Sequence, residues 1–183
     1  MDKKLLLCAL GAKEEVEFDE FGEIWTMNDW YLFDPDYTPD RVYNIHANFM
    51  SKPKPSHRFI DWLEVYRNTD CPIISREDWG LNNQFFYNDK ERFELFGEDF
   101  FTHTLCYMLA DAYCEGYREI YIYRLSLDIA IKDYLNQIRG ILRAFDKMRS
   151  MGASVYCRNE DRARKDVDTV DWSTVQEINY RYE

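Results

Sequence analysis

Two of the three histidines in this chain, His46 and His103, are candidates for acid–base chemistry. An imidazole suits a general base because its pKa lies near neutrality. Asp128 is a third candidate catalytic residue, and together with Asp29 and Asp40 it could hold a divalent cation such as magnesium beside a phosphate. The competing interpretation of each histidine is structural. His46 would then be a polar residue that ends a strand, and His103 an exposed residue in a first helical turn.

A segment of 29 residues, FFTHTLCYMLADAYCEGYREIYIYRLSLD, predicts a helix followed by a buried strand. Thr102 or Thr104 is expected to cap the helix with its hydroxyl. Gly116 is expected to end the helix in the left-handed conformation, and a strand without polar alternation follows from 120 to 123. The polar start of this helix is also a candidate phosphate-binding position, because free N–H groups and the helix dipole favour an anion there.

Apolar runs alternate with amphipathic helical patterns along the rest of the chain. We expect further strands at 4–10, 23–27, 41–46, 72–75 and 153–157, and helices at 58–66, 91–96 and 132–149. This alternation predicts an α/β protein with a Rossmann-like three-layer fold, a mainly parallel sheet of about five to six strands and helices on both faces. Residues 76–98 are expected to form a largely irregular, site-covering loop. We expect one domain over residues 1–157 and a charged tail over 158–183 that packs on the domain or extends from it.

Several polar residues follow the expected strands. Gly11 ends the first strand, Asn28 and Asp29 end the second, and His46 ends the third. Asp128 follows the strand after Gly116. Open α/β sheets bind ligands beyond the carboxyl ends of their strands, so these residues predict a cleft at one edge of the sheet, facing the helix that begins near Thr104.

Composition limits the class of partner. The net charge of −11 argues against a general nucleic-acid binder or an anionic-membrane binder, which would need a basic surface. The 14 tyrosines suggest a wide amphipathic pocket or the surface of a homo-oligomer, although they could simply edge the core.

The five cysteines contain no CxxC pair and are expected to be reduced, with Cys8, Cys106 and Cys114 buried. No Cys/His cluster has the spacing of zinc ligands, so we expect no metal site of that kind. The beginning of the chain reads as a first strand rather than a signal peptide, and no apolar run is long enough to span a bilayer. A cytoplasmic location is expected.

The order of a Gly-containing loop, "WTMND", "DRVYNIH" and the helix–strand unit resembles the Rossmann-type domain of bacterial sialyltransferases. It is equally similar to the related domains of motility accessory factors and archaeal pterin pyrophosphokinases, and in length to small phage-encoded proteins. The resemblance implies that Gly11, Asn28, Thr102 and Thr104 surround a nucleotide, with Asp128 near its sugar or phosphates.

Three features depart from the sialyltransferase pattern. The glycine that precedes the final aspartate in that pattern is absent, and Arg124 stands in this region. The loop after the first strand reads LGAKEE, so the carboxylates of Glu14 and Glu15 stand where an anion would sit. The histidine that sialyltransferases use as a base beyond the matched strand is absent, because no histidine follows His103.

Three functions therefore stay open. The first is a nucleotide or nucleotide-sugar enzyme, in the form of a degenerate glycosyl- or phosphotransferase. The second is a non-catalytic protein that sequesters a small phosphorylated ligand or nucleotide. The third is an interaction protein of a phage accessory or counter-defence type, with its acidic, Tyr-rich surface facing a basic partner. We favour binding of a nucleotide-type ligand.

Overall fold

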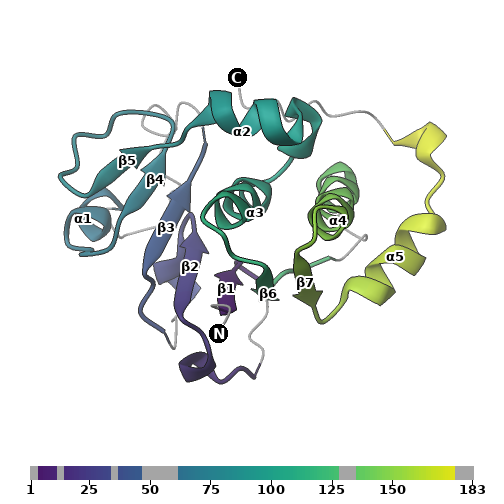
Figure 1. Cartoon of the computed structure of the whole chain (residues 1–183), viewed down its shortest axis with the longest axis horizontal. Coiled ribbons are helices and arrows are strands. Elements are labelled where there is room, and N and C mark those ends of the chain that lie inside the picture. Colours follow the sequence, from purple (N-terminus) through teal and green to yellow (C-terminus); the bar gives the residue numbers. More distant parts are fainter. Residues whose placement is uncertain (1–3, 12–14, 34–36, 47–61, 128–134, 176–183) are drawn as a thin grey trace.

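A computed structural model describes residues 4–11, 15–33, 37–46, 62–127 and 135–175. These residues form an α/β fold around a sheet of seven strands in the order β5-β4-β3-β2-β1-β6-β7 (Figure 1). All neighbouring strands are parallel. The strands are β1 (Lys4–Cys8), β2 (Glu23–Met27), β3 (Arg41–Asn44), β4 (Ile73–Ser75), β5 (Gln84–Phe86), β6 (Glu119–Tyr123) and β7 (Ser154–Cys157). The predicted fold class is confirmed, with one strand more than the upper end of the expected range.

Helices cover both faces of the sheet. The α-helices are α1 (Trp62–Arg67), α2 (Asp89–Phe96), α3 (Thr104–Cys114), α4 (Leu135–Ser150) and α5 (Glu160–Asp168). Four 3-10 helices are η1 (Phe18–Glu20), η2 (Trp30–Phe33), η4 (Glu98–Phe100) and η6 (Trp172–Thr174). Helices α3 and α4 pack on one face, whereas α1 packs on the other face over β3 and β4. Aromatic side chains from η1 and its neighbours cover the region of β1 and β6 on that second face.

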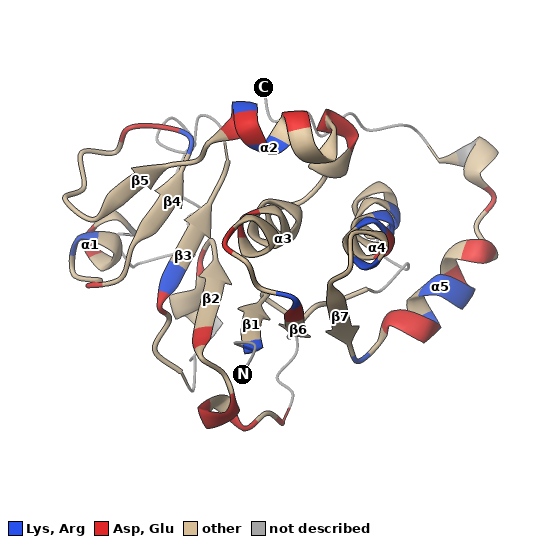
Figure 2. Cartoon of the chain, viewed as in Figure 1, with Lys and Arg blue, Asp and Glu red and all other residues tan. Residues whose placement is uncertain are grey.

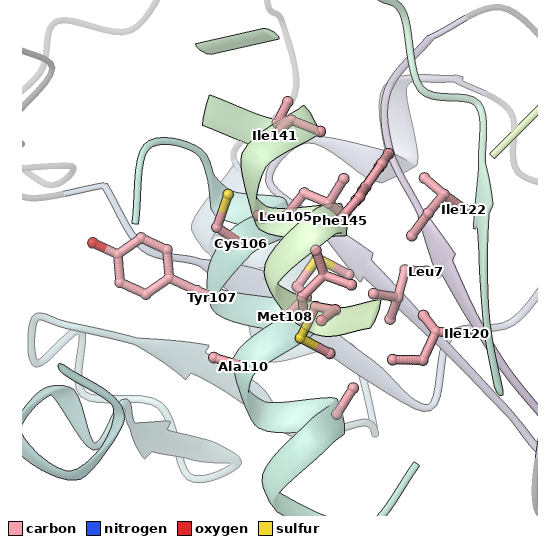
Figure 3. Close-up of a cluster of buried hydrophobic side chains, with 14 of the residues drawn as sticks. Leu7, Leu105, Cys106, Tyr107, Met108, Ala110, Ile120, Ile122, Ile141 and Phe145 are labelled. Carbon is pink, nitrogen blue, oxygen red and sulfur yellow. The ribbon is translucent and has the colours of Figure 1, made fainter. Parts of the chain in front are cut away.

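The main core lies between the sheet and the pair α3 and α4. Figure 3 shows Leu7 and Ile120 of the sheet directed toward Met108 of α3 and Phe145 of α4. Alternate β1 residues are buried on both faces, which explains why this strand reads as a continuous apolar run. The expected inward residues of the long helix are all buried: Leu135, Ile138, Ile141, Leu142, Phe145 and Met148.

The end of α3 follows the sequence prediction. Gly116 has a φ of 91°, and its N–H donates to the carbonyl of Tyr113. The next N–H, that of Tyr117, donates to the carbonyl of Ala112. This Schellman motif satisfies carbonyls that the helix leaves free, and it turns the chain directly into β6.

The short helix expected at 91–96 is confirmed as α2, whereas the rest of the segment 76–98 is not wholly irregular, because it also contains β5. Strand β5 was missed because it has only three residues and lies at the end of the sheet, with Phe85 55% and Phe86 62% exposed. A strand that buries neither face leaves no periodic pattern of apolar residues.

Helix α5 lies within the expected charged tail and packs against α4. Ala163 is buried, and Glu160 binds Arg149 of α4 at 2.6 Å and Arg164 at 2.6 Å. Figure 2 shows both charge signs along α5. The pKa of Glu160 is lowered because these two guanidinium groups outweigh its burial.

All five cysteines are free thiols. Cys8 and Cys106 are buried as expected, whereas Cys114 is only partly buried. Burial raises the pKa of Cys8 to about 12 and that of Cys106 to about 11, so both thiols stay protonated at neutral pH. Among the described residues, no helix is both long and apolar enough to cross a membrane.

Candidate functional site

Two asparagines lie side by side at the carboxyl edge of the sheet. Asn28 follows β2 directly, and Asn44 is the last residue of β3. The strands pair with Met27 opposite Tyr43, and the Asn28 N–H donates to the Tyr43 carbonyl at 2.7 Å. Asn28 has a φ of 46°, a left-handed conformation that asparagine tolerates better than most residues.

Tyr66 of α1 connects the two asparagines. The Asn44 side-chain amide donates to the Tyr66 hydroxyl at 3.2 Å, and this hydroxyl donates to the Asn28 carbonyl at 2.7 Å. Tyr66 is fully buried, and its ring stacks on Trp79 with centroids 5.8 Å apart. Helix α1 therefore fixes the backbone of Asn28 from the face opposite α3.

The side-chain oxygens of both asparagines are buried, and neither has a hydrogen-bond partner among the described residues. A buried acceptor without a partner costs about 1–3 kcal/mol, so such atoms call for a functional or structural reason. Asn28 is partly exposed and Asn44 is fully buried. Asn28 is thus the residue that a ligand could contact, whereas Asn44 holds Tyr66 in place.

His103 caps α3, so the prediction that Thr102 or Thr104 caps it is wrong. The Nδ1 atom of His103 accepts a hydrogen bond from the Leu105 N–H at 3.1 Å. His103 is partly buried rather than exposed. Burial, assisted by the nearby His46, lowers the pKa of His103 to about 4. The ring is therefore neutral near pH 7, and its proton lies on Nε2.

This arrangement changes the chemistry available to His103. Because Nδ1 is occupied by the helix cap, the ring can offer a neutral N–H donor at Nε2 but no free base. His46 follows β3 by two residues and is close enough to lower the pKa of His103. The beginning of α3 and the end of β3 therefore meet at the same edge as Asn28.

The two threonines are packed against the protein. Thr102 contacts α4 so closely that a Cβ atom on Gly140 would lie 2.0 Å from its Oγ1. Its Oγ1 also lies 3.8 Å from the sulfur of Cys106. Thr104 is buried as the first residue of α3. Thr102 therefore joins α3 to α4.

Gly11 joins the loops after β1 and β6, where the strand order reverses. Its N–H donates to the Arg124 carbonyl at 2.5 Å, and the Arg124 Nε donates to the Gly11 carbonyl at 3.2 Å. A Cβ atom at Gly11 would lie 2.3 Å from the Arg124 carbonyl oxygen. Glycine is needed here for close backbone approach, but its amide is already bonded within the protein.

The structure separates Asp29 from Asp40, so these two carboxylates do not share a cation. Asp40 precedes β3 and accepts from the Ile24 N–H at 2.8 Å, at the amino edge of the sheet. Asp29 lies at the carboxyl edge, buried and bonded to the Tyr31 hydroxyl at 3.4 Å. Asp128 lies outside the described residues. Within the described part of the chain, no group of three His, Cys, Asp or Glu side chains could hold a metal ion.

Asn44 and Tyr66 were missed as site residues. Asn44 could have been found as the amide at the end of the third strand, matching Asn28 after the second. Tyr66 gave no such signal, because its spacing with Leu63 is that of an ordinary buried helix face. Glu15, which seemed to oppose an anion at Gly11, instead lines a hollow beside β7, and Glu14 lies outside the described residues.

No protein-family model and no curated protein matches this chain. A solved structure of the sialyltransferase CstII from Campylobacter jejuni, in complex with the substrate analogue CMP-3FNeuAc, is similar with a TM-score of 0.57. The two share 15% identity, and the match covers 85% of this chain and 79% of that chain. The described structure is thus an α/β protein with a sialyltransferase-like, Rossmann-type fold. The resemblances to motility accessory factors, pterin pyrophosphokinases and phage proteins stay predictions.

Proposed function

We propose that this protein binds a nucleotide or nucleotide-sugar at the edge formed by Asn28 and the beginning of α3. The observation that carries the proposal is the Asn28 side-chain oxygen, buried without a partner at the carboxyl end of β2. Ligands of open α/β sheets bind at this edge. The fold-level similarity to a structure holding a cytidine nucleotide-sugar analogue supports this class of ligand.

Each group in the site has a separate part in this proposal. The Asn28 oxygen accepts from an N–H or O–H of the base or sugar. The neutral His103 ring donates from Nε2 to a phosphate or hydroxyl oxygen, and the α3 dipole favours the phosphate. Thr102 and Thr104 support α3, and Gly11 keeps the neighbouring loop close to Arg124.

Glycosyl or phosphoryl transfer would need a general base. His46 is the remaining candidate of the two histidines, because the Nδ1 atom of His103 caps the helix. We propose His46 for this role, with Asp128 as the second candidate. Release of CMP from a CMP-sugar, lost in His46→Asn while binding persists, would support transfer. Binding without turnover would support the sequestering function.

A second candidate function is interaction with another protein. Phe85 and Phe86 are exposed on the three-residue edge strand β5, which can accept a further strand. The net charge of −11 favours a basic partner. Under this proposal, Phe86→Lys would abolish capture of the partner and leave nucleotide binding unchanged.

A thermal-shift screen tests the main proposal. CMP, UMP, AMP, GMP and their sugar-linked forms would be tested with and without magnesium. A true ligand raises the melting temperature by mass action. A rise that depends on magnesium would show that the cation binds with the phosphates. No rise in melting temperature with any nucleotide would contradict the proposal.

We also propose a cytoplasmic location, which the free thiols support.

A further inference from the structure

A hollow of about 460 Å³ lies beside the edge strand β7. Its walls come from β1, β6, β7, the segment before η1, the end of α4 and the beginning of α5. This volume lies within the range of small-molecule sites. The hollow shares no lining residue with the edge formed by Asn28, Asn44, His46 and His103.

One wall is aromatic. Tyr121 of β6 and Tyr156 of β7 are cross-strand partners, and their rings stack with centroids 4.6 Å apart and planes 23° apart. Tyr156 is 47% exposed, and β7 is the last strand of the sheet. Among the strands of the described ranges, none covers the outer side of Tyr156, so a ring-shaped ligand has room to lie against it.

The charged residues of the hollow fall into two groups. Arg149 and Glu160 bind each other at 2.6 Å, and Arg149 also donates to the Val155 carbonyl, so this pair holds α5 to α4. Glu15, Arg158 and Asp161 are exposed, and no ion pair connects them to other residues in the described ranges. The hollow thus presents two carboxylates and one guanidinium to a ligand.

This combination selects the charge of the ligand. A cation would be attracted by Glu15 and Asp161 but repelled by Arg158. An anion would be attracted by Arg158 but repelled by the two carboxylates. A neutral polyol satisfies all three groups, because a hydroxyl both donates to carboxylates and accepts from a guanidinium. A pyranose ring also presents a flat face of C–H groups, which suits the exposed Tyr156 ring.

We propose that the hollow beside β7 is a binding site for a neutral carbohydrate, held against Tyr156 by Glu15, Arg158 and Asp161. The proposal goes beyond the nucleotide site and does not rest on it, because the two sites share no residue. Loss of nucleotide binding would leave it standing, and loss of sugar binding would leave the nucleotide site standing.

Saturation-transfer NMR on the whole chain tests this proposal. The probes are methyl glycosides of glucose, galactose, mannose and N-acetylglucosamine, with lactose and cellobiose, each at about 10 mM, where weak complexes are detectable. We expect at least one sugar to bind. Tyr156→Ala should weaken it about tenfold, as loss of a central aromatic contact does. Arg158→Ala and Asp161→Ala should each weaken it about threefold or more, and both exposed positions tolerate substitution.

Phe86→Ala is the matched control, because Phe86 is also an exposed aromatic residue on an edge strand, at the opposite end of the sheet. Sugar binding should be unchanged in this variant. The proposal is overturned if no sugar binds, or if Tyr156→Ala, Arg158→Ala and Asp161→Ala all bind as the wild type does. Arginine amide and inorganic phosphate complete the panel. Binding of either one in place of the sugars, lost in Tyr156→Ala, would assign the hollow to a charged ligand instead.

Discussion

The hydroxyl of Tyr66 donates a 2.7 Å hydrogen bond to the backbone carbonyl of Asn28, which holds the residue after β2 in its left-handed conformation. The same hydroxyl accepts from Asn44, so one side chain from α1 fixes the ends of two strands. The geometry of the proposed nucleotide site thus depends on α1 as well as on Asn28 and the beginning of α3.

Tyr66→Phe isolates this hydroxyl. The ring would keep its stacking on Trp79, but the Asn28 carbonyl and the Asn44 amide would lose their shared partner. We expect a loss of about 1–3 kcal/mol in the free energy of unfolding, measured by urea denaturation, and weaker binding of any nucleotide found in the screen. Unchanged nucleotide affinity in the folded variant would show that this network does not position Asn28.

The pH dependence of stability reports on His103. Its pKa is lowered from 6.5 to about 4 in the folded protein, so the unfolded chain binds the proton more readily. Stability should therefore be unaffected by this group above pH 6.5 and fall as the pH drops from 6.5 toward 4. We expect the loss of unfolding free energy attributable to His103 to be about 3 kcal/mol over this interval.

His103→Asn supplies the control for that measurement, because asparagine keeps a capping side chain without titrating in this range. The difference between the two unfolding free energies should shrink or reverse as the pH falls. Parallel curves for the two proteins would mean that His103 is not buried in its neutral form.

The ion pair between Arg92 and Asp111 should contribute to stability. Asp111 accepts from Arg92 at 2.7 Å and from the Tyr43 hydroxyl at 2.9 Å, which connects α2, α3 and β3. Arg92→Ala would leave the buried Asp111 carboxylate without its cation. The free energy of unfolding should fall by about 2–4 kcal/mol. Arg162→Ala removes an exposed pair with Asp166 and should cost less than about 0.5 kcal/mol. Equal losses of unfolding free energy in the two variants, measured by chemical denaturation, would show that the Arg92–Asp111 pair does not stabilise the fold.

Gly140 tests the placement of Thr102. An alanine in a helix interior normally stabilises the helix by about 1 kcal/mol relative to glycine. Here the new Cβ would meet Thr102 Oγ1 at 2.0 Å, so Gly140→Ala should instead destabilise the fold by about 1–3 kcal/mol. The penalty should be smaller in a Thr102→Ala background. A stabilising Gly140→Ala would show that Thr102 does not pack against α4.

Much of the fold could be predicted from the sequence because its helices and central strands bury continuous or periodic apolar patterns. The inward face of α4 and the Gly116 turn are examples. Strand β5 could not be found this way, since its three residues are mostly exposed. Its sequence therefore has no apolar periodicity that would predict a strand.

The candidate site was only partly predictable for a different reason. Asn28 and His46 follow strands, and this position alone indicates one edge of the sheet. The contact of Thr102 with Gly140 depends on how α3 meets α4, which local sequence does not encode. The His103 cap is local, but it was missed because the neighbouring threonines are the commoner capping residues. Asp29 and Asp40 are close in sequence, but β2 and β3 are parallel, so the two residues lie at opposite edges.

Self-association remains a prediction. Trp79 of the aromatic run from Trp79 to Phe86 is buried against Tyr66, so only part of that run is available to a second copy. The exposed Phe85 and Phe86 make β5 the expected contact, most simply in a two-fold dimer. Light scattering should show a dimer at tens of micromolar that Phe86→Lys converts to monomer. A monomeric wild type would contradict this expectation.

Titration calorimetry of CMP and a CMP-linked sugar against wild type and Asn28→Gly tests the central claim most directly. Glycine keeps the positive φ of Asn28 and removes only its side-chain amide. Asn82→Gly, at an exposed turn, is the matched control. We predict that the wild type and Asn82→Gly bind the nucleotide equally well. Asn28→Gly should lose about 1–3 kcal/mol of binding free energy. Equal affinity in all three folded proteins, or no binding to the wild type, would contradict a nucleotide site at Asn28.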